Sequence, residues 1–143
     1  MVHHVVYGIT QDQETKIYMV VWNELCKKCD CICNAIYFQQ NFENWTSGNN
    51  DLDEFIQDFQ LSAHSYYVKN ALEWIPYDRF YDIKFIAKDG FGKMYGANWI
   101  DGYIQYWDNC NQNWKRKNSN MFVNLISLNN PNDITSEEFI NKV

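Results

Sequence analysis

The sequence predicts an α+β fold, in which an antiparallel sheet follows a hairpin, a cysteine cluster and an amphipathic helix. Two patterns predict it. Runs of β-branched and aromatic residues near both ends of the chain are separated by polar or glycine-containing turns, as in antiparallel strands. Between them, apolar residues recur at three- and four-residue steps, the period of a helix. The 143 residues, 46% hydrophobic and 17% aromatic, are enough for one modest domain or for part of a larger one.

The N-terminal third is expected to contain the hairpin and the cysteines. Residues 5–21 are predicted to form the hairpin, because the runs VVYGI and IYMVVW flank the polar segment TQDQETK. The cluster CKKCDCIC follows, from Cys26 to Cys33. Residues 34–50 mix apolar and polar side chains and end in NWTSGNN, which is typical of a loop.

The amphipathic helix is expected to begin near Asp51, with Asn49, Asn50 or Asp51 as its cap. It is expected to end at WIPY, because Pro76 disfavours helical backbone at Ile75. Its apolar face comprises Leu52, Phe55, Ile56, Phe59, Ala63, Tyr66, Tyr67 and Trp74.

After Pro76 the pattern changes to strands. Strands are predicted over residues 80–87, 93–100, 103–107 and 121–128, with Asp101-Gly102 as a two-residue hairpin turn and 108–120 as a polar loop. A helix capped by Thr135 or Ser136 is expected to begin after that. The chain stops within two turns of this start, so we expect a truncated piece of a larger fold.

Charge and hydropathy exclude several classes of protein. The net charge of −6 argues against a nucleic-acid module, and the one basic run, WKRK at 114–117, is interpreted as a solvated loop. The first residues lack the pattern of a secretory signal, and no apolar run is long enough for a membrane helix. We therefore expect a cytoplasmic protein with no membrane partner and with reduced thiols.

The cysteines leave two interpretations open. Cys26, Cys29 and Cys33 with a distant fourth ligand form a plausible zinc set, because thiolates are good zinc ligands and a C-x-x-C turn presents two of them to one ion. His64 is the better fourth ligand, and Cys110 is a substitute. The alternative is that the thiols are reduced and partly packed, since the usual second C-x-x-C pair is missing.

The segment IAKDGFGKMYGANW, residues 86–99, contains a glycine-rich turn. A dinucleotide-binding turn is rejected, because the glycine spacing is wrong and a strand follows instead of a helix. A glycine-rich turn between two strands is instead the form of the protein-kinase phosphate loop. FVNLISL resembles the third strand of a kinase N-lobe, and SEEFINKV resembles the start of the helix beside it.

The chain as a whole resembles the N-lobe of the protein kinase superfamily, and more narrowly a group of kinase-like proteins expanded in mycorrhizal fungi. The resemblance rests on LEWIPYDRFYDIKFIAKDGFGKMYGANWIDG, on NQNWKR and on the leader NAIYFQQNFENWTSGN. The opening YGITQDQETKIYMVV also resembles the fourth and fifth kinase strands, although it comes first here. It is either the remnant of another kinase unit or a reused hairpin. The resemblance thus divides the chain into residues 1–22, 23–75 and 76–143.

The resemblance implies ATP with Mg²⁺ as cofactor, bound beside the glycine turn and the third strand. The positions that it assigns to the nucleotide are Ile86, Ala87, Lys88, Asp89, Gly90, Phe91, Gly92, Met94 and Ile126. Several of them depart from the kinase pattern. Ala87 and Asp89 replace two glycines, Ile126 replaces the phosphate-binding lysine, and Lys142 stands where the helix glutamate is expected.

Two hypotheses for function follow. In the first, the chain is a kinase-like fragment whose family phosphorylates Ser/Thr or Tyr with ATP. It lacks the lysine, the glutamate and the catalytic loops, so it is expected to be pseudokinase-like, with weak or no ATP binding. In the second, it is a protein-interaction module whose leader binds a partner and carries the zinc. Its anchors would be exposed aromatics of the insert hairpin: Tyr103, Tyr106, Trp107 and Trp114. Both expect another protein, or another kinase unit, as partner.

Overall fold

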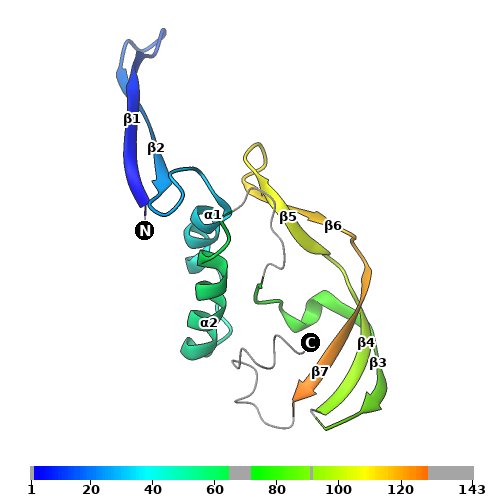
Figure 1. Ribbon diagram of the computed structural model, residues 1–143. Helices are drawn as coiled ribbons and strands as arrows, with labels where there is room; N and C mark the ends of the chain where they lie inside the picture. Colours follow the sequence, from blue (N-terminus) through cyan, green and yellow to red (C-terminus); the bar gives the residue numbers. More distant parts are fainter. Residues whose placement is uncertain (1, 65–71, 91, 129–143) are drawn as a thin grey trace.

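The computed structural model describes residues 2–64, 72–90 and 92–128, and it has the predicted α+β architecture. All strand pairs in these ranges are antiparallel. They form a two-stranded hairpin, a three-stranded sheet in the order β3-β4-β7, and a second two-stranded unit, β5-β6. Figure 1 shows the first hairpin on one side of the two α-helices and the other strands on the opposite side. No helix within these ranges is long and apolar enough to cross a membrane.

The N-terminal hairpin is longer than the sequence predicted. It consists of β1 (Val2–Gln11) and β2 (Tyr18–Cys26), with a bulge at Tyr7, where the register shifts between Val6 and Gly8. The turn is closed by Asp12, whose side chain accepts hydrogen bonds from the amides of Glu14 and Thr15. Because β2 ends at Cys26, the hairpin leads directly into the cysteine cluster.

Two helices follow the cluster. The short α1 (Asn34–Gln40) lies where the sequence suggested only a mixed segment, and the 3-10 turn η1 (Phe42–Asn44) continues it. Helix α2 (Asn50–Leu61) is capped by Asn49, whose side chain accepts from the amide of Leu52 at 3.1 Å. Of the three predicted alternatives, the cap is therefore Asn49.

The extent predicted for the second helix is wrong. It ends at Leu61 instead of continuing to WIPY, and Leu72 to Trp74 are not helical. Residues 65–71 of the predicted face lie outside the described ranges. The hydroxyl of Ser62 donates to the carbonyl of Phe59, and the amide of Ala35 donates to the carbonyl of Ala63 at 2.8 Å. The second bond draws the end of α2 toward the start of α1, and this tertiary contact overrides the helical period.

The C-terminal strands lie close to their predicted ranges. They are β3 (Phe80–Lys88), after the 3-10 turn η2 (Tyr77–Arg79), β4 (Gly92–Trp99), β5 (Tyr103–Asp108) and β7 (Met121–Leu128). The predicted loop 108–120 contains a further strand, β6 (Asn113–Lys117), paired with β5. The helix expected after Thr135 lies outside the described residues.

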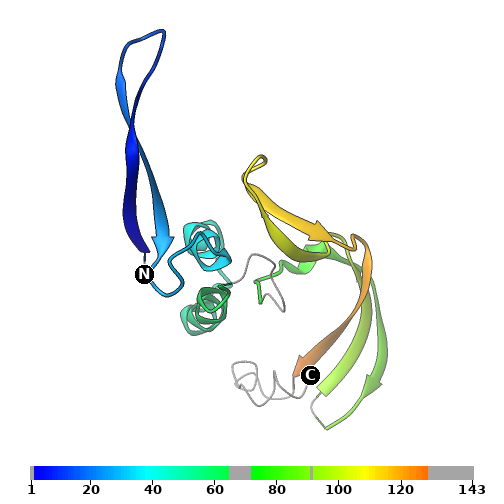
Figure 2. The same cartoon turned by 45° about the horizontal axis from the view of Figure 1, so that its top comes forward.

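The hairpin predicted at Asp101-Gly102 is also wrong, because β4 and β5 do not pair with each other. β4 pairs with β3 and β7, and β5 pairs with β6. The amide of Asn120 donates to the carbonyl of Ile100 at 3.1 Å, so β4-β5 and β6-β7 form one long ribbon with a bend between its two halves (Figure 2). Gly102 lies at this bend in the left-handed region, with φ of 73°.

The β5-β6 unit packs on the leader through aromatic rings. Trp107 is buried and stacks on Tyr37 of α1 at 4.8 Å, and Trp114 packs against Phe38 at 4.3 Å. The two tryptophans also contact each other edge to face. Trp107 and Trp114 are therefore packing residues of the fold, which corrects the hypothesis that they are exposed anchors for a partner.

The basic run at 114–117 is not simply a solvated loop. Arg116 forms two hydrogen bonds to the carboxylate of Glu73, at 2.7 and 2.8 Å, and donates to the carbonyl of Gly102 at 3.0 Å. Its guanidinium also lies 6.0 Å from the ring centre of Trp99. This half-buried ion pair joins the segment before η2 to the ribbon.

Candidate metal centre

The cysteine cluster forms a compact loop at the root of the hairpin. The amide of Cys26 donates to the carbonyl of Cys31 at 3.0 Å, and the amide of Asp30 donates to the carbonyl of Cys26 at 2.8 Å. Asp30 takes a left-handed conformation, with φ of 53°, that reverses the chain after Cys29. The amide of Lys28 lies 3.4 Å from the Cys26 sulfur and donates to it. The loop thus folds back over the buried Cys26 side chain.

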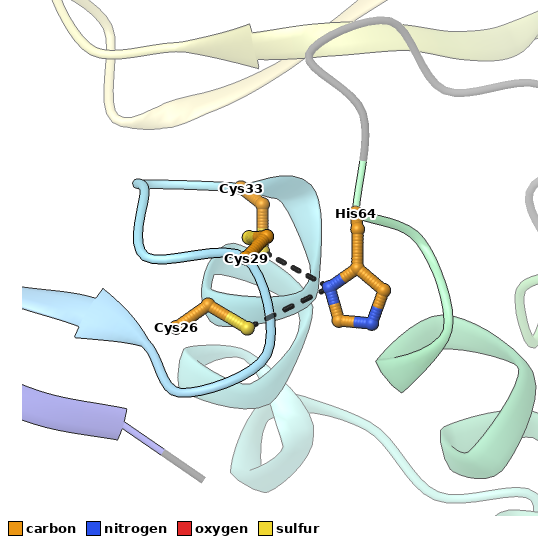
Figure 3. Close-up of side chains that lie close together, drawn as sticks. All are labelled: Cys26, Cys29, Cys33 and His64. Atoms are coloured by element: carbon orange, nitrogen blue, oxygen red, sulfur yellow. Dashed lines mark hydrogen bonds between the residues drawn. The ribbon is translucent and has the colours of Figure 1, made fainter.

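The other two ligand positions come from the helices. Cys33 is the residue before α1, and its side chain is buried. His64 is brought to it by the hydrogen bond between Ala35 and Ala63, because Ala63 precedes the histidine directly. The Nδ1 atom of His64 lies 3.6 Å from the sulfur of Cys26 and 3.6 Å from the sulfur of Cys33 (Figure 3).

Four ligand atoms meet at this place. The sulfurs of Cys26, Cys29 and Cys33 and a ring nitrogen of His64 all lie within 4.8 Å of one another. Cys29 is the exposed member, so the site has an open side through which an ion can enter. This cluster can hold a metal ion, and it is the set of four that the sequence favoured.

The separations agree with a tetrahedral ion. Bonds of about 2.3 Å to sulfur and about 2.0 Å to nitrogen, at tetrahedral angles, place a sulfur and a nitrogen ligand about 3.6 Å apart. The two sulfur–nitrogen distances to His64 have this value. Cys26, Cys33 and His64 therefore have the spacing of such an ion's ligands, and all four ligand atoms lie within 4.8 Å of one another.

The thiols differ in acidity according to their surroundings. Burial raises the pKa of Cys33 to about 12, so without an ion this thiol is protonated at neutral pH. The Cys31 side chain hydrogen-bonds to Cys29, with the sulfurs 3.1 Å apart, and this lowers the pKa of Cys29 and raises that of Cys31. A bound cation would deprotonate the buried thiol, because metals bind the thiolate.

Two cysteines lie outside the four-ligand set. Cys31 is exposed and contacts Cys29 from the outer side of the loop. Cys110 is exposed in the turn between β5 and β6, far along the chain from the cluster. His64 is thus the fourth residue of the cluster, and the substitute set with Cys110 is not formed.

The nine residues assigned to a nucleotide are spread over the β3-β4-β7 sheet. Ile86, Ala87 and Lys88 end β3, Gly92 and Met94 begin β4, and Met94 is paired with Ile126 of β7. Asp89 and Gly90 form the turn, and Phe91 lies outside the described residues.

The turn is closed on itself by Asp89. The amide of Asp89 donates to the carbonyl of Gly92 at 2.9 Å, and the amide of Gly92 donates to the Asp89 carboxylate at 3.2 Å. A phosphate loop needs its backbone amides directed at the ligand. Here one such amide already donates a hydrogen bond to a side chain. This contact was not predicted from the sequence, although aspartate frequently forms hydrogen bonds in turns.

A cavity of about 420 Å³ lies on the same sheet. Among the assigned positions that the structure describes, Ile126 alone lines it, beside described residues that carry no positive charge: Tyr77, Phe80, Ile83, Tyr95, Leu125 and Ser127. The described part of its lining is mostly apolar and holds no cation for a phosphate. The sheet therefore gives no support for ATP with Mg²⁺.

No known protein family, curated protein or solved structure matches this chain. The kinase resemblance and the division of the chain into three parts therefore stay predictions.

Proposed function

We propose that the chain is a non-catalytic protein-interaction module whose leader is organised by a structural zinc ion. The ligands are Cys26, Cys29, Cys33 and His64. The observation that carries this proposal is the convergence of the four ligand atoms within 4.8 Å.

The donor set favours zinc over other metals. Three thiolates and one imidazole are soft and borderline ligands, which zinc accepts in tetrahedral geometry, whereas magnesium and calcium need oxygen ligands. Four protein ligands also leave no position for a substrate or a reactive water. Such an ion stabilises the fold and does not catalyse a reaction.

The position of the ion gives it this structural role. It joins the end of β2, the start of α1 and His64, which lies two residues beyond the C-cap of α2. The first two of these segments also form a small buried cluster of Cys26, Cys33, Ala35 and Ile36, against which Val2 packs. A core of this size contributes little, so small domains often add a metal. Large apolar side chains remain exposed on β1 and β2, which is typical of surfaces that contact other proteins.

Metal analysis of the purified chain tests the zinc site. We expect one zinc per chain, and we expect cobalt to replace it with the visible absorption of a tetrahedral thiolate site. Cys33→Ser should remove the ion, because Cys33 is a buried ligand. Cys31→Ser is the matched control, since Cys31 lies in the same loop but outside the set, and it should keep full stoichiometry.

Two results would contradict the proposal. One is a chain with no metal after preparation under reducing conditions with zinc supplied. The other is equal loss of zinc in Cys31→Ser and Cys33→Ser, because the ligands would then not be those that the geometry selects.

A second candidate is the kinase-like fragment with weak or absent ATP binding. It is favoured by one observation: the predicted strands around the glycine turn pair as β3-β4-β7, with Met94 opposite Ile126. The closed turn at Asp89 and the uncharged residue Ile126 argue for weak binding.

A nucleotide titration, with and without Mg²⁺, distinguishes the candidates. The double variant Ile126→Lys/Lys142→Glu restores the ion pair of an active kinase. A gain in ATP affinity in this variant supports the kinase-like assignment. If neither the wild type nor the variant binds ATP, the phosphate-site assignment is wrong.

A further inference from the structure

One face of the β1-β2 hairpin is strongly apolar and open to solvent. Val6 is paired with Trp22 and Ile9 with Val20, so their side chains share a face, and Tyr18 joins them by strand alternation. These five residues form the outer face. Their exposed fractions are 65% for Val6, 74% for Ile9, 74% for Tyr18, 57% for Val20 and 52% for Trp22.

The outer face continues a face that is buried at its root. Val2 and Cys26 are paired on the same side of the hairpin, where Cys26 belongs to the buried cluster beside α1 and Val2 packs against that cluster. Farther out, the hairpin projects away from the helices and sheets in both views (Figures 1 and 2). Nothing in the described ranges covers the apolar residues beyond the root.

Such a hairpin is incomplete by itself. A two-stranded hairpin is at best marginally stable in water, and it gains stability when its apolar face packs against another element. Charged residues usually protect exposed strands from association, but none occurs from Ile17 to Asn23.

We propose that a second copy of this chain covers the outer face, so that two hairpins pack face to face around a two-fold axis. This second copy would be the partner of the interaction module proposed above, and to that extent the dimer rests on the proposed function. A two-fold contact uses the same patch twice, and such dimers are the commonest oligomers. The packing is that of two stacked sheets.

The size of the face fits a dimer. A large apolar side chain that is more than half exposed contributes roughly 100 Å² of buried area when a partner covers it. Five such side chains on each copy give about 1,000 Å² of buried area in total, which is near the lower limit of a specific interface.

The charges also fit a second copy. The face itself is uncharged, and at its margin His4 lies 3.2 Å from the carboxylate of Glu24 on the same hairpin. Two chains that each carry a net charge of −6 can therefore meet here without opposing like charges. A basic or acidic partner would find no complementary charge on the five residues.

Sedimentation equilibrium of the full chain with zinc tests this proposal. We expect a monomer–dimer equilibrium at concentrations from about 1 to about 100 µM. Val20→Lys places a charge in the centre of the outer face and should weaken the dimer at least about tenfold, or about 1.4 kcal/mol. Val21→Lys is the matched control, because Val21 is the next residue, is 44% exposed and points to the opposite face.

Ile9→Lys repeats the test from the other strand, since Ile9 is the partner of Val20. The proposal is overturned if the wild type stays monomeric. This holds even if the monomer binds a different protein or vesicles of neutral lipid. A dimer that Val20→Lys and Ile9→Lys leave intact, or that Val21→Lys weakens equally, overturns it as well. Zinc stoichiometry, measured on the same samples, reports on the proposed metal site separately, because no variant changes a ligand.

Discussion

Replacing Gly102 by alanine tests the bend of the long ribbon. A Cβ atom at this position would lie 2.1 Å from the carbonyl oxygen of Lys117 and 2.9 Å from that of Asn118. Both are backbone atoms, one in the last residue of β6 and one in the residue after it, so they cannot rotate away as a flexible side chain would. The φ of 73° adds a second cost, because side chains with a Cβ disfavour the left-handed region.

The expected magnitude is the sum of these two costs. A left-handed backbone costs about 1–2 kcal/mol for a residue other than glycine. An overpacked contact costs about 1–3 kcal/mol. We therefore expect Gly102→Ala to lower the free energy of unfolding by about 2–5 kcal/mol, a large part of the stability of a small domain.

Gly48→Ala is the matched control. Gly48 has φ of 84°, but a Cβ there would meet no atom within 4 Å. This variant should lose only about 1–2 kcal/mol from the backbone conformation. The difference between the variants then measures the contact with β6.

Urea unfolding, monitored by tryptophan fluorescence, gives both values, because Trp99 is buried beside the bend. Equal losses in the two variants, or no loss in Gly102→Ala, would refute the account of the bend.

Three further outcomes are expected from interactions elsewhere in the fold. In a double-mutant cycle with Glu73→Gln and Arg116→Met, urea unfolding should give a coupling energy of about 1–3 kcal/mol, since this pair is only half-buried. A coupling energy near zero would mean that the pair does not hold the segment before η2. Hydrogen bonding to Arg79 lowers the pKa of Asp101, so its stabilisation is full above the unfolded pKa and is lost as pH falls through the lower folded value. The difference in stability between wild type and Asp101→Asn should accordingly shrink below about pH 4, and a constant difference would contradict this assignment. Chelation of zinc should lower the thermal midpoint of the wild type and of Cys110→Ser equally but leave Cys33→Ser unchanged, as measured by circular dichroism.

The ranges of the apolar strands were largely predictable because their signals are local. Asn49 was one of three neighbouring residues predicted as the helix cap, and the apolar runs of β3, β4 and β7 gave their approximate ranges. β6 was missed because its composition is polar. Its alternation was nevertheless informative, because Trp114 and Arg116 are half-buried whereas their neighbours are exposed.

Features that depend on distant contacts were predicted less well. The early end of α2 follows from the bond between Ala35 and Ala63, which no local pattern indicates. The role of Arg116 depends on Glu73, 43 residues away. The four residues of the cluster could be grouped from the sequence, because the spacing of three cysteines restricts the choice and a tetrahedral site needs a fourth, distant side chain.

The position of Cys26 connects two properties of the molecule that are otherwise separate. It is the last residue of β2 and also one of the four proposed ligands, so an ion held there would fix the direction in which the hairpin leaves α1. In the proposed dimer that direction must be the same in both copies. Metal binding and self-association would then be thermodynamically linked, and by reciprocity the dimer would bind zinc more tightly than the monomer by the factor with which zinc favours the dimer. Self-association would rise and fall with the zinc supply of the cell.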